Sequence, residues 1–446
     1  MMRKSIFLIG VAFVLIFTYL TTVSAFTLHS AKGVTQVDMS KVMDGYVIFS
    51  ADKSGKTFLV DLAGNVVHTW NGTGYEMLPP ELANGEKGHV LVTSRGKMTE
   101  LDWDGNVVWE YNAGKYKFHH DWQKLPNGNY MILGRTSVPE DMVPTEFHGL
   151  GLEGKANKVK MSRAMYGDLI VEISADKKEA VWEWYGHDHL DLSKVCAYPI
   201  GGCIRGGDWT HFNSIHWCTN PGYEGKVMAS NRHHNEAIMI DYKTGDIVWR
   251  WGGNEMGHQH DVQMIDPGLP GEGNILIFDN GLHTIAGYWG SRVLEVDPKT
   301  DKVVWKFGGI SPNNTSFHSS HISGCERLPN GNTLIIEGEN ARIFEVTPEK
   351  EIVWEYISPF FNGGDRGEKG PSVFKARKVP SAWIDKNKIR MTDEMKKTAE
   401  MMKKIQDNSK EIDELTIQVN DVWGYKPTSG KGGKGEKGKK GKKGKK

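Results

Sequence analysis

The stretch AIMIDYKTGDIVWRW, residues 237–251, decides the fold, because it consists of two apolar runs separated by a short polar turn. Both runs are rich in β-branched and aromatic residues, which is typical of β-strands. A turn that contains glycine joins them, so the stretch predicts a β-hairpin. The same unit recurs five times, as TFLVDLAGNVVHTW (57–70), MTELDWDGNVVWEY (98–111), LIVEISADKKEAVWEW (169–184), RVLEVDPKTDKVVWKF (292–307) and RIFEVTPEKEIVWEY (342–356).

Each hairpin follows another short apolar strand, such as KVMASN at 226–231 or NILIFD at 274–279. Six units of three or four strands predict the six blades of a β-propeller, because a single blade cannot bury both of its faces and stacking the blades radially does so. A long β-sandwich is the alternative, and six matching units favour the propeller. We therefore expect an all-β protein whose six-bladed β-propeller covers residues 40–375.

The N-terminus resembles a targeting segment. Arg3 and Lys4 precede an uncharged apolar run at residues 6–20, and Val-Ser-Ala at 23–25 offers the small-x-small pattern of a cleavage site. Residues 1–25 are therefore a predicted signal peptide, with an uncleaved signal anchor as the alternative. This segment predicts a periplasmic or secreted protein.

Beyond the repeat, residues 390–420 have a composition that favours a helix. Residues 428–446 are mainly lysine and glycine, cannot bury apolar surface and are expected to form a disordered tail. The tail is either a solubilising extension or a peripheral contact with anions of the cell envelope, and nothing else in the charge pattern suggests nucleic acid. Cys196 and Cys203, in CAYPIGGC, are the predicted disulfide pair, since export permits disulfides.

Four of the six units carry a histidine just before the strand that opens the unit. These histidines are His120, His211, His260 and His321. The innermost strands of a propeller line its central channel, so residues in this phase are predicted to converge near the axis. Two units lack the histidine, which places the expected cluster off-centre. The alternative is that each histidine only hydrogen-bonds within its own blade.

Such a cluster permits several chemistries. Imidazoles can bind a metal, exchange protons or act as covalent nucleophiles. Arg232 leaves the strand that follows His211, and a guanidinium at the site favours an anionic group such as sulfuryl or phosphoryl over a metal cation. A metal-dependent lyase, hydrolase or hydratase that uses the four histidines remains an alternative, as does a non-catalytic propeller scaffold of the envelope.

Four segments are similar to bacterial arylsulfotransferases that work without an adenylyl-sulfate donor. They are HHDWQKLPNGN (119–129), DWTHFNSIHW (208–217), MASNRHHNEAIMID (228–241) and HQHDVQ (258–263). The resemblance implies a periplasmic six-bladed propeller that moves a sulfuryl group from a phenolic sulfate ester to a phenolic acceptor. In this family the reaction is ping-pong and passes through a sulfohistidine. No cofactor and no bound metal are expected.

The resemblance also assigns roles to individual residues. His260 matches the nucleophile, and His211 and Arg232 match residues that bind the sulfuryl oxygens. The first family histidine falls on the pair His119–His120, of which His120 is the expected catalytic member. The residues expected to bind substrate are His119, Asn213 and His321.

Overall fold

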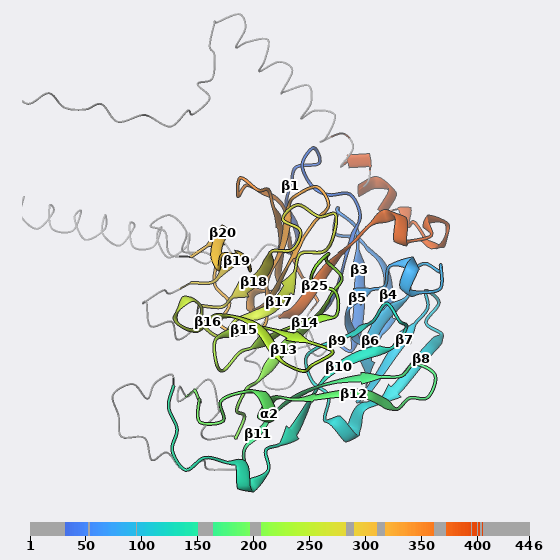
Figure 1. The fold of residues 1–446 in the computed structure, drawn as a ribbon. Coiled ribbons are helices and arrows are strands. Elements are labelled where there is room, and N and C mark those ends of the chain that lie inside the picture. The colour runs from blue at the N-terminus through green and yellow to red at the C-terminus, as the bar shows by residue number, and fades with distance from the viewer. Residues whose placement is uncertain are drawn as a thin grey trace, which may run out of the picture. The chain divides into compact units, whose positions relative to one another are not determined.

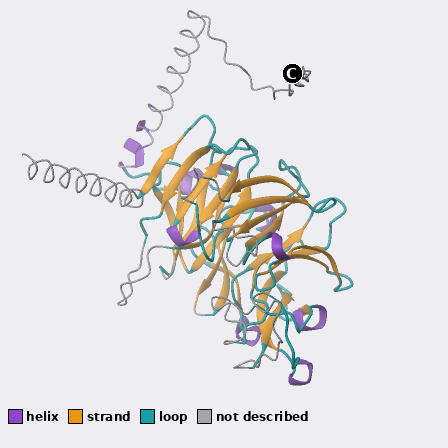
Figure 2. Ribbon diagram, turned by 90° about the vertical axis from the view of Figure 1, so that its left-hand side faces the viewer, coloured by secondary structure: helices purple, strands orange, loops and turns teal. Residues whose placement is uncertain are grey.

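The computed structural model of the protein describes residues 32–51, 54–94, 96–149, 164–196, 207–281, 290–309, 317–360, 372–393, 395–398, 400, 401 and 404. Within the compact unit 1–392, the described residues form six antiparallel sheets (Figure 1). Inner strands of neighbouring sheets contact each other at five of the six junctions, and a shared hydrophobic cluster around Trp109 and Tyr130 fills the sixth, so that the six sheets close into a ring. The predicted six-bladed β-propeller is confirmed, and strands dominate this unit (Figure 2).

We number the blades along the chain and give the strands of each from the inside outward. Blade 1 is β25 (Val373–Val379), β2 (Tyr46–Ala51), β3 (Lys56–Val60) and β4 (Val66–Asn71). Blade 2 is β5 (Thr73–Met77), β6 (Val90–Ser94), β7 (Lys97–Leu101) and β8 (Val107–Asn112). Blade 3 is β9 (Trp122–Lys124), β10 (Tyr130–Ser137), β11 (Tyr166–Ile173) and β12 (Ala180–Tyr185).

The remaining blades follow the same order. Blade 4 is β13 (Phe212–Cys218), β14 (Lys226–Asn231), β15 (Glu236–Asp241) and β16 (Ile247–Gly252). Blade 5 is β17 (His260–Met264), β18 (Ile275–Asp279), β19 (Arg292–Asp297) and β20 (Lys302–Gly308). Blade 6 is β21 (Gly324–Arg327), β22 (Thr333–Glu337), β23 (Arg342–Val346), β24 (Ile352–Ile357) and β1 (Gly33–Val37).

Short helical turns lie in the connections between strands. They are η1 (Pro80–Leu82), η2 (Ala113–Tyr116), η3 (Glu140–Met142), α2 (Gly186–His189), η5 (Gly253–Glu255), η6 (Gly338–Asn340), η7 (Ser381–Trp383) and η8 (Lys386–Lys388). In the described part of the chain, no helix is long and apolar enough to cross a membrane.

Strands from both ends of the propeller close the ring. The innermost strand of blade 1, β25, comes from the C-terminal side and pairs with β2 from the N-terminal side. In turn, β1 pairs with the outer edge of β24. The strands thus extend beyond the predicted range 40–375 on both sides. The repeat ends at Trp354 in the sequence, and β25 was missed because VFKARKV carries three basic residues and has no hairpin partner next to it.

The repeated tryptophans join neighbouring blades. In every blade an outer-strand indole N–H donates to a backbone carbonyl in a turn of the next blade, at 2.9–3.1 Å in the six pairs Trp70–Asp102, Trp109–Ala175, Trp184–Gly245, Trp251–Asp301, Trp305–Pro348 and Trp354–Leu62. Buried indole N–H groups need such partners. The tryptophan of each repeat therefore fixes one blade against its neighbour all the way round the ring.

The turns of the hairpins are built by aspartate and glycine. In blade 1 the Asp61 carboxylate accepts hydrogen bonds from the backbone N–H groups of Ala63 and Asn65, and Gly64 adopts φ +83°. Asp102 and Gly105, with φ +83°, occupy the same places in blade 2. Aspartate caps its own turn and glycine tolerates the left-handed region, so these residues set the register of the hairpin.

Beyond residue 392 the structure describes residues 393, 395–398, 400, 401 and 404, which are helical. They fall at the start of the predicted helix 390–420. The rest of that prediction, the signal peptide 1–25 and the basic tail 428–446 lie outside the described residues.

Candidate active site

The candidate site lies where the inner strands of blades 3, 4 and 5 begin. His120 stands two residues before β9 and His211 immediately before β13, with φ of 58° and 52°, and His260 is the first residue of β17. Left-handed backbone is uncommon for residues other than glycine and is often found at functional sites. The three strands therefore present three imidazoles at one end of the central channel.

His119 orients the His120 imidazole through a hydrogen bond between the two rings. The Nε2 atom of His119 lies 2.8 Å from Asp168 Oδ1 and 3.2 Å from the carbonyl oxygen of Gly134, and its Nδ1 lies 2.6 Å from Nδ1 of His120. If the Nε2–H of His119 points to these acceptors, its Nδ1 accepts a hydrogen bond from the Nδ1–H of His120. Burial, followed by the positive charges of its neighbours, lowers the pKa of His120 well below the usual value, so that His120 is neutral.

Asp208 orients two histidines at once. Its carboxylate oxygen Oδ2 accepts from Nδ1 of His211 at 2.5 Å, and its backbone oxygen accepts from Nδ1 of His233 at 2.8 Å. The two imidazoles stack, with ring centroids 4.9 Å apart. Burial lowers the pKa of His233 well below the usual value, and its buried Nε2 has no hydrogen-bond partner among the described residues.

The tautomer of His260 follows from its partner Asn280. The Asn280 amide nitrogen donates to the carbonyl oxygens of Ser319 at 2.8 Å and Ile322 at 3.0 Å, so its oxygen is left to accept a hydrogen bond from His260 Nδ1 at 2.7 Å. Burial, followed by the charge of Arg232, lowers the pKa of His260 well below the usual value. A neutral His260 with its proton on Nδ1 carries its lone pair on Nε2, which makes Nε2 a nucleophile.

Arg232 is a buried cation, and the Asp208 carboxylate lies within electrostatic range of it. The residue is only 5 % exposed, and no described residue forms a hydrogen bond or ion pair with its guanidinium. Burial lowers the pKa of Arg232 to about 10. A buried charge is costly unless it is paired, so this group is suited to binding an external anion.

The structure brings the four predicted catalytic residues together. The ring centroids of His120 and His211 lie 4.9 Å apart. The rings of His120 and His260 both approach the ring of Phe374, at 5.7 and 6.4 Å. The positive charge of Arg232 contributes to lowering the pKa of His260, so the guanidinium lies within electrostatic range of that imidazole.

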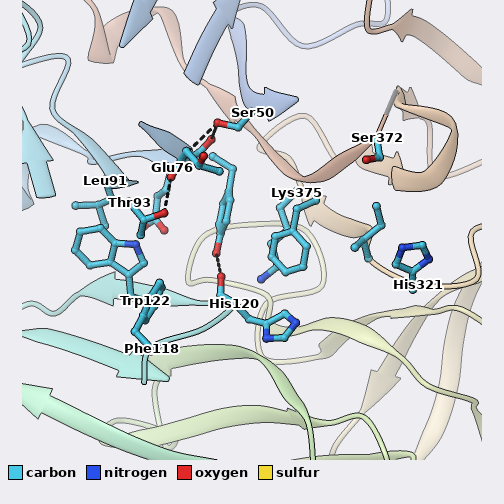
Figure 3. A pocket seen from close by; sticks show the side chains of 15 residues that line it. Ser50, Glu76, Leu91, Thr93, Phe118, His120, Trp122, His321, Ser372 and Lys375 are labelled. Carbon is cyan, nitrogen blue, oxygen red and sulfur yellow. Dashed lines mark hydrogen bonds between the residues drawn. The ribbon is translucent and has the colours of Figure 1, made fainter. Parts of the chain in front are cut away.

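A cavity of about 340 Å³ opens beside His120 (Figure 3). Four aromatic side chains line it, namely Tyr75, Phe118, Trp122 and Phe374. His120 points toward its middle, while His321 lies at the opposite side from Trp122. His211 and His260 are not among its lining residues. The cavity is large enough for a small aromatic molecule with one end at His120.

The three predicted substrate-binding residues have different surroundings. His119 faces Asp168 within blade 3, as described above. The Asn213 amide nitrogen donates to the carbonyl oxygen of Gln259 at 2.8 Å, and its oxygen is buried without a partner among the described residues. His321 stays away from the cluster: its side chain is 53 % exposed and pairs with Glu339 at 2.7 Å. The predicted partner of Cys196, Cys203, lies outside the described residues.

Several residues of the site were missed from the sequence. Asp208 stands three residues before His211, a spacing that could have identified it. Asn280 follows β18 in the segment FDNG, and no local pattern marks it. Lys375 comes from β25, and its Nζ lies 2.9 Å from Asp121 and 3.0 Å from Asp261, the residues that follow His120 and His260. Arg135 on β10 is half-buried, its Nε is buried without a hydrogen-bond partner among the described residues, and its positive charge contributes to lowering the pKa of His120.

Three side chains of the site could hold a metal ion. Asp208, His211 and His233 offer ligand atoms that lie within 4.8 Å of one another. Two histidines and one carboxylate form a set that transition metals accept. The unpaired guanidinium of Arg232 opposes a cation in the same place, because its charge acts on both His233 and Asp208.

The family model of the arylsulfotransferases (ASST) matches residues 30–257. The chain belongs to this arylsulfotransferase family. The matched range contains His120, His211 and Arg232, and ends three residues before His260. Membership of the family implies an arylsulfotransferase-like enzyme whose substrates are small aryl sulfates. No curated protein matches this arylsulfotransferase.

Solved structures resemble the arylsulfotransferase chain only distantly. A protein of unknown function from Bacteroides caccae is 11% identical, with a TM-score of 0.44, and the alignment covers 75% of this chain and 98% of that one. The Dos1 propeller is 12% identical with a TM-score of 0.35, at 76% and 77% coverage. Virginiamycin B lyase from Staphylococcus aureus is 12% identical with a TM-score of 0.36, at 74% and 90% coverage.

Proposed function

We propose that the protein transfers a sulfuryl group from a phenolic sulfate ester to a phenolic acceptor through a sulfohistidine at His260. The observation that carries the proposal is the buried guanidinium of Arg232, which forms no ion pair with any described residue and lies within electrostatic range of the neutral His260 imidazole, whose lone pair is on Nε2. The guanidinium favours an anionic ligand, and the imidazole supplies a nucleophile in the same place. A sulfate ester supplies the anionic group and an electrophilic sulfur.

In the first half-reaction, the lone pair on His260 Nε2 attacks the sulfur atom. A nitrogen–sulfur bond forms, and the sulfur–oxygen bond to the aryl group breaks with its electron pair on the phenolate oxygen. Arg232 and His211 bind the sulfuryl oxygens and stabilise the charge that develops on them and on the leaving oxygen. The proton on His260 Nδ1 remains hydrogen-bonded to the Asn280 oxygen, which stabilises the positive charge that the ring acquires.

In the second half-reaction, the oxygen of the acceptor phenol attacks sulfur and the nitrogen–sulfur bond breaks, returning its electron pair to Nε2. The acceptor proton passes to the lone pair of the neutral His120, whose Nδ1 is engaged by His119. His120 then releases that proton to solvent, from which the phenolate that left in the first half-reaction takes one up, so the enzyme returns to its starting protonation state. Both half-reactions use the same groups, as a ping-pong mechanism requires.

We place the aromatic ring of the substrate in the cavity beside His120. Tyr75, Trp122 and Phe374 offer ring faces and edges, which favour aromatic ligands by about 0.5–1.5 kcal/mol per contact. We further propose that the enzyme works in the periplasm or outside the cell, as the N-terminal segment predicts.

The test is a continuous assay with a chromogenic aryl sulfate as donor. We expect sustained release of the phenol only when a second phenol is present, and loss of release in His260→Ala. The matched control is His148→Ala, because His148 is 56 % exposed and pairs with Asp191 in a loop. Undiminished transfer by His260→Ala contradicts the assigned mechanism.

A metal-dependent lyase or hydrolase is a second candidate, favoured by the proximity of Asp208, His211 and His233. It predicts that the purified protein contains stoichiometric metal, and that a chelator removes metal and activity together. Sulfuryl transfer that persists in chelator with no bound metal excludes this candidate.

A further inference from the structure

Lys375, on the ring-closing strand β25, bridges the two carboxylates that directly follow His120 and His260 along the chain. The residue is 1% exposed, and its Nζ lies 2.9 Å from Asp121 Oδ2 and 3.0 Å from Asp261 Oδ1. Because one ammonium contacts both carboxylates, their oxygens lie close together, and their charges would repel each other without it. Blade 1 thus connects the histidine of blade 3 with the histidine of blade 5.

Each of the two carboxylates also fixes the backbone next to its histidine. The Asp121 carboxylate accepts a hydrogen bond from the backbone N–H of Ile215 in blade 4 at 3.0 Å, and the Asp261 carboxylate accepts one from Cys325 in blade 6 at 2.9 Å. His120 and Asp261 have φ of 58° and 50°. Such backbone persists only where the surrounding contacts hold it. A shift of either carboxylate therefore turns the backbone that carries the imidazole.

The residue before Lys375 contacts the same two histidines directly. The ring of Phe374 lies 5.7 Å from that of His120 and 6.4 Å from that of His260, measured between centroids. Two consecutive residues of β25 are thus in contact with both imidazoles and with both of the carboxylates that follow them.

The other two histidines of the repeat show what such a carboxylate does. His211 belongs to the cluster, and the backbone N–H of the next residue, Phe212, donates to the buried Asp168 carboxylate at 2.7 Å. His321 is followed by Ile322, which carries no carboxylate, and its own side chain is 53 % exposed. In this chain, the histidines of the cluster are those whose following residue is held through a buried carboxylate.

We propose that Lys375 is a positioning residue for the reaction, which sets the separation and orientation of His120 and His260 through Asp121 and Asp261. The ammonium acts on the two imidazoles through the carboxylates, and a small displacement suffices, because a misplacement of about 1 Å can cost about 10²-fold in rate. The inference rests on the proposed function, since it concerns the imidazoles that attack sulfur and accept the phenol proton.

The experiment compares steady-state sulfuryl transfer by Lys375→Met and Lys378→Met. Lys378 is a matched control on the same strand: it is 3% exposed, and its Nζ lies 3.0 Å from the buried carboxylate of Glu345 in blade 6, which is next to no histidine. Each variant breaks one buried ion pair, so both are expected to lose stability. At a temperature at which circular dichroism shows both folded, we expect Lys375→Met alone to lower kcat, by about 10²-fold, with little change in the KM of the donor. Equal kcat values in the two variants overturn the inference.

A second variant separates positioning from stability. Adding Asp121→Asn to Lys375→Met removes a buried charge that has no other cationic partner among the described residues, so the protein regains stability, but the bridge remains broken. We expect kcat to stay low in this double variant. A kcat that returns together with the stability overturns the inference, and the double variant decides where Lys375→Met alone does not fold.

Nitrogen-15 NMR of protein labelled at histidine reports on the imidazoles without any reaction. The signals of His120 and His260, assigned by their loss in His120→Gln and His260→Gln, are expected to shift in Lys375→Met and to stay in place in Lys378→Met. Signals that stay in place in both variants overturn the inference. A wild type that shows these shifts but transfers no sulfuryl group contradicts the proposed function alone, and a wild type that transfers while both lysine variants keep equal kcat contradicts this inference alone.

Discussion

Replacing Lys375 by methionine should destabilise the propeller strongly, because this side chain is 1% exposed and its Nζ bridges two buried carboxylates. Breaking a buried ion pair on one side costs about 3–5 kcal/mol. Here both carboxylates keep other partners. Asp261 retains two bonds from Arg377 at 2.9 Å, and Asp121 retains the backbone N–H groups of Trp122 and Ile215 at 3.0 Å. We therefore expect the lower end of that range, about 3 kcal/mol.

The assay is urea unfolding at pH 7, compared at the midpoint. The control is Lys388→Met, which removes an exposed lysine paired with Asp104 at 3.3 Å and should cost less than about 1 kcal/mol. Adding Asp121→Asn to Lys375→Met should recover part of the loss, because Asp121 is left without a cationic partner among the described residues, whereas Asp261 keeps Arg377. Equal midpoints for Lys375→Met and Lys388→Met would refute the reasoning.

Three further predictions concern the site and the buried Glu76 on β5. Arg232→Met should lower kcat about 10²–10³-fold, as loss of a charge-stabilising donor does, whereas Arg250→Met, at an exposed ion pair, should not. Asn280→Asp should raise the pKa of His260 and move the acidic limb of the pH–rate profile to higher pH; an unmoved limb contradicts the assigned tautomer. Burial raises the pKa of Glu76 to about 7, so its contribution to stability is lost as the pH rises through 7. Glu76→Gln should therefore be more stabilising at pH 8 than at pH 6, by about 1 kcal/mol, in thermal unfolding; an equal effect at both pH values contradicts the shift.

The sequence predicts the blades well because each hairpin is encoded locally. The alternating strands, the Asp-x-x-Gly turns and the tryptophans lie within one repeat, and a ring follows once six such units must bury their faces. His120, His211 and His260 were predicted to converge because they stand at equivalent positions of the repeat, at the start of the inner strands. Arg232 was predicted to lie at the site because it follows the strand next to the one that His211 precedes. Its charge acts on His260 and Asp208, so it belongs to the same cluster.

The rest of the site depends on contacts between distant segments. Lys375 lies more than 250 residues from Asp121, and only ring closure by β25 brings the two together. Arg135 stands in an ordinary strand, and nothing in its own segment distinguishes it from a surface arginine. His321 shares the phase of the other histidines, but the chain before β21 takes a different path there, with Ile322 and Ser323 at positive φ, and the imidazole stays exposed.

The central claim is that His260 Nε2 forms a bond to sulfur. The most direct measurement mixes the enzyme with an aryl sulfate in the absence of acceptor and quenches the reaction rapidly. Mass spectrometry follows, under conditions that preserve the labile nitrogen–sulfur bond of a sulfohistidine. The account predicts the mass of one added SO3 group, mapped to the peptide that contains His260, absent in His260→Ala and discharged by added phenol. An unmodified protein during turnover, or a modification that maps to another residue, would contradict it.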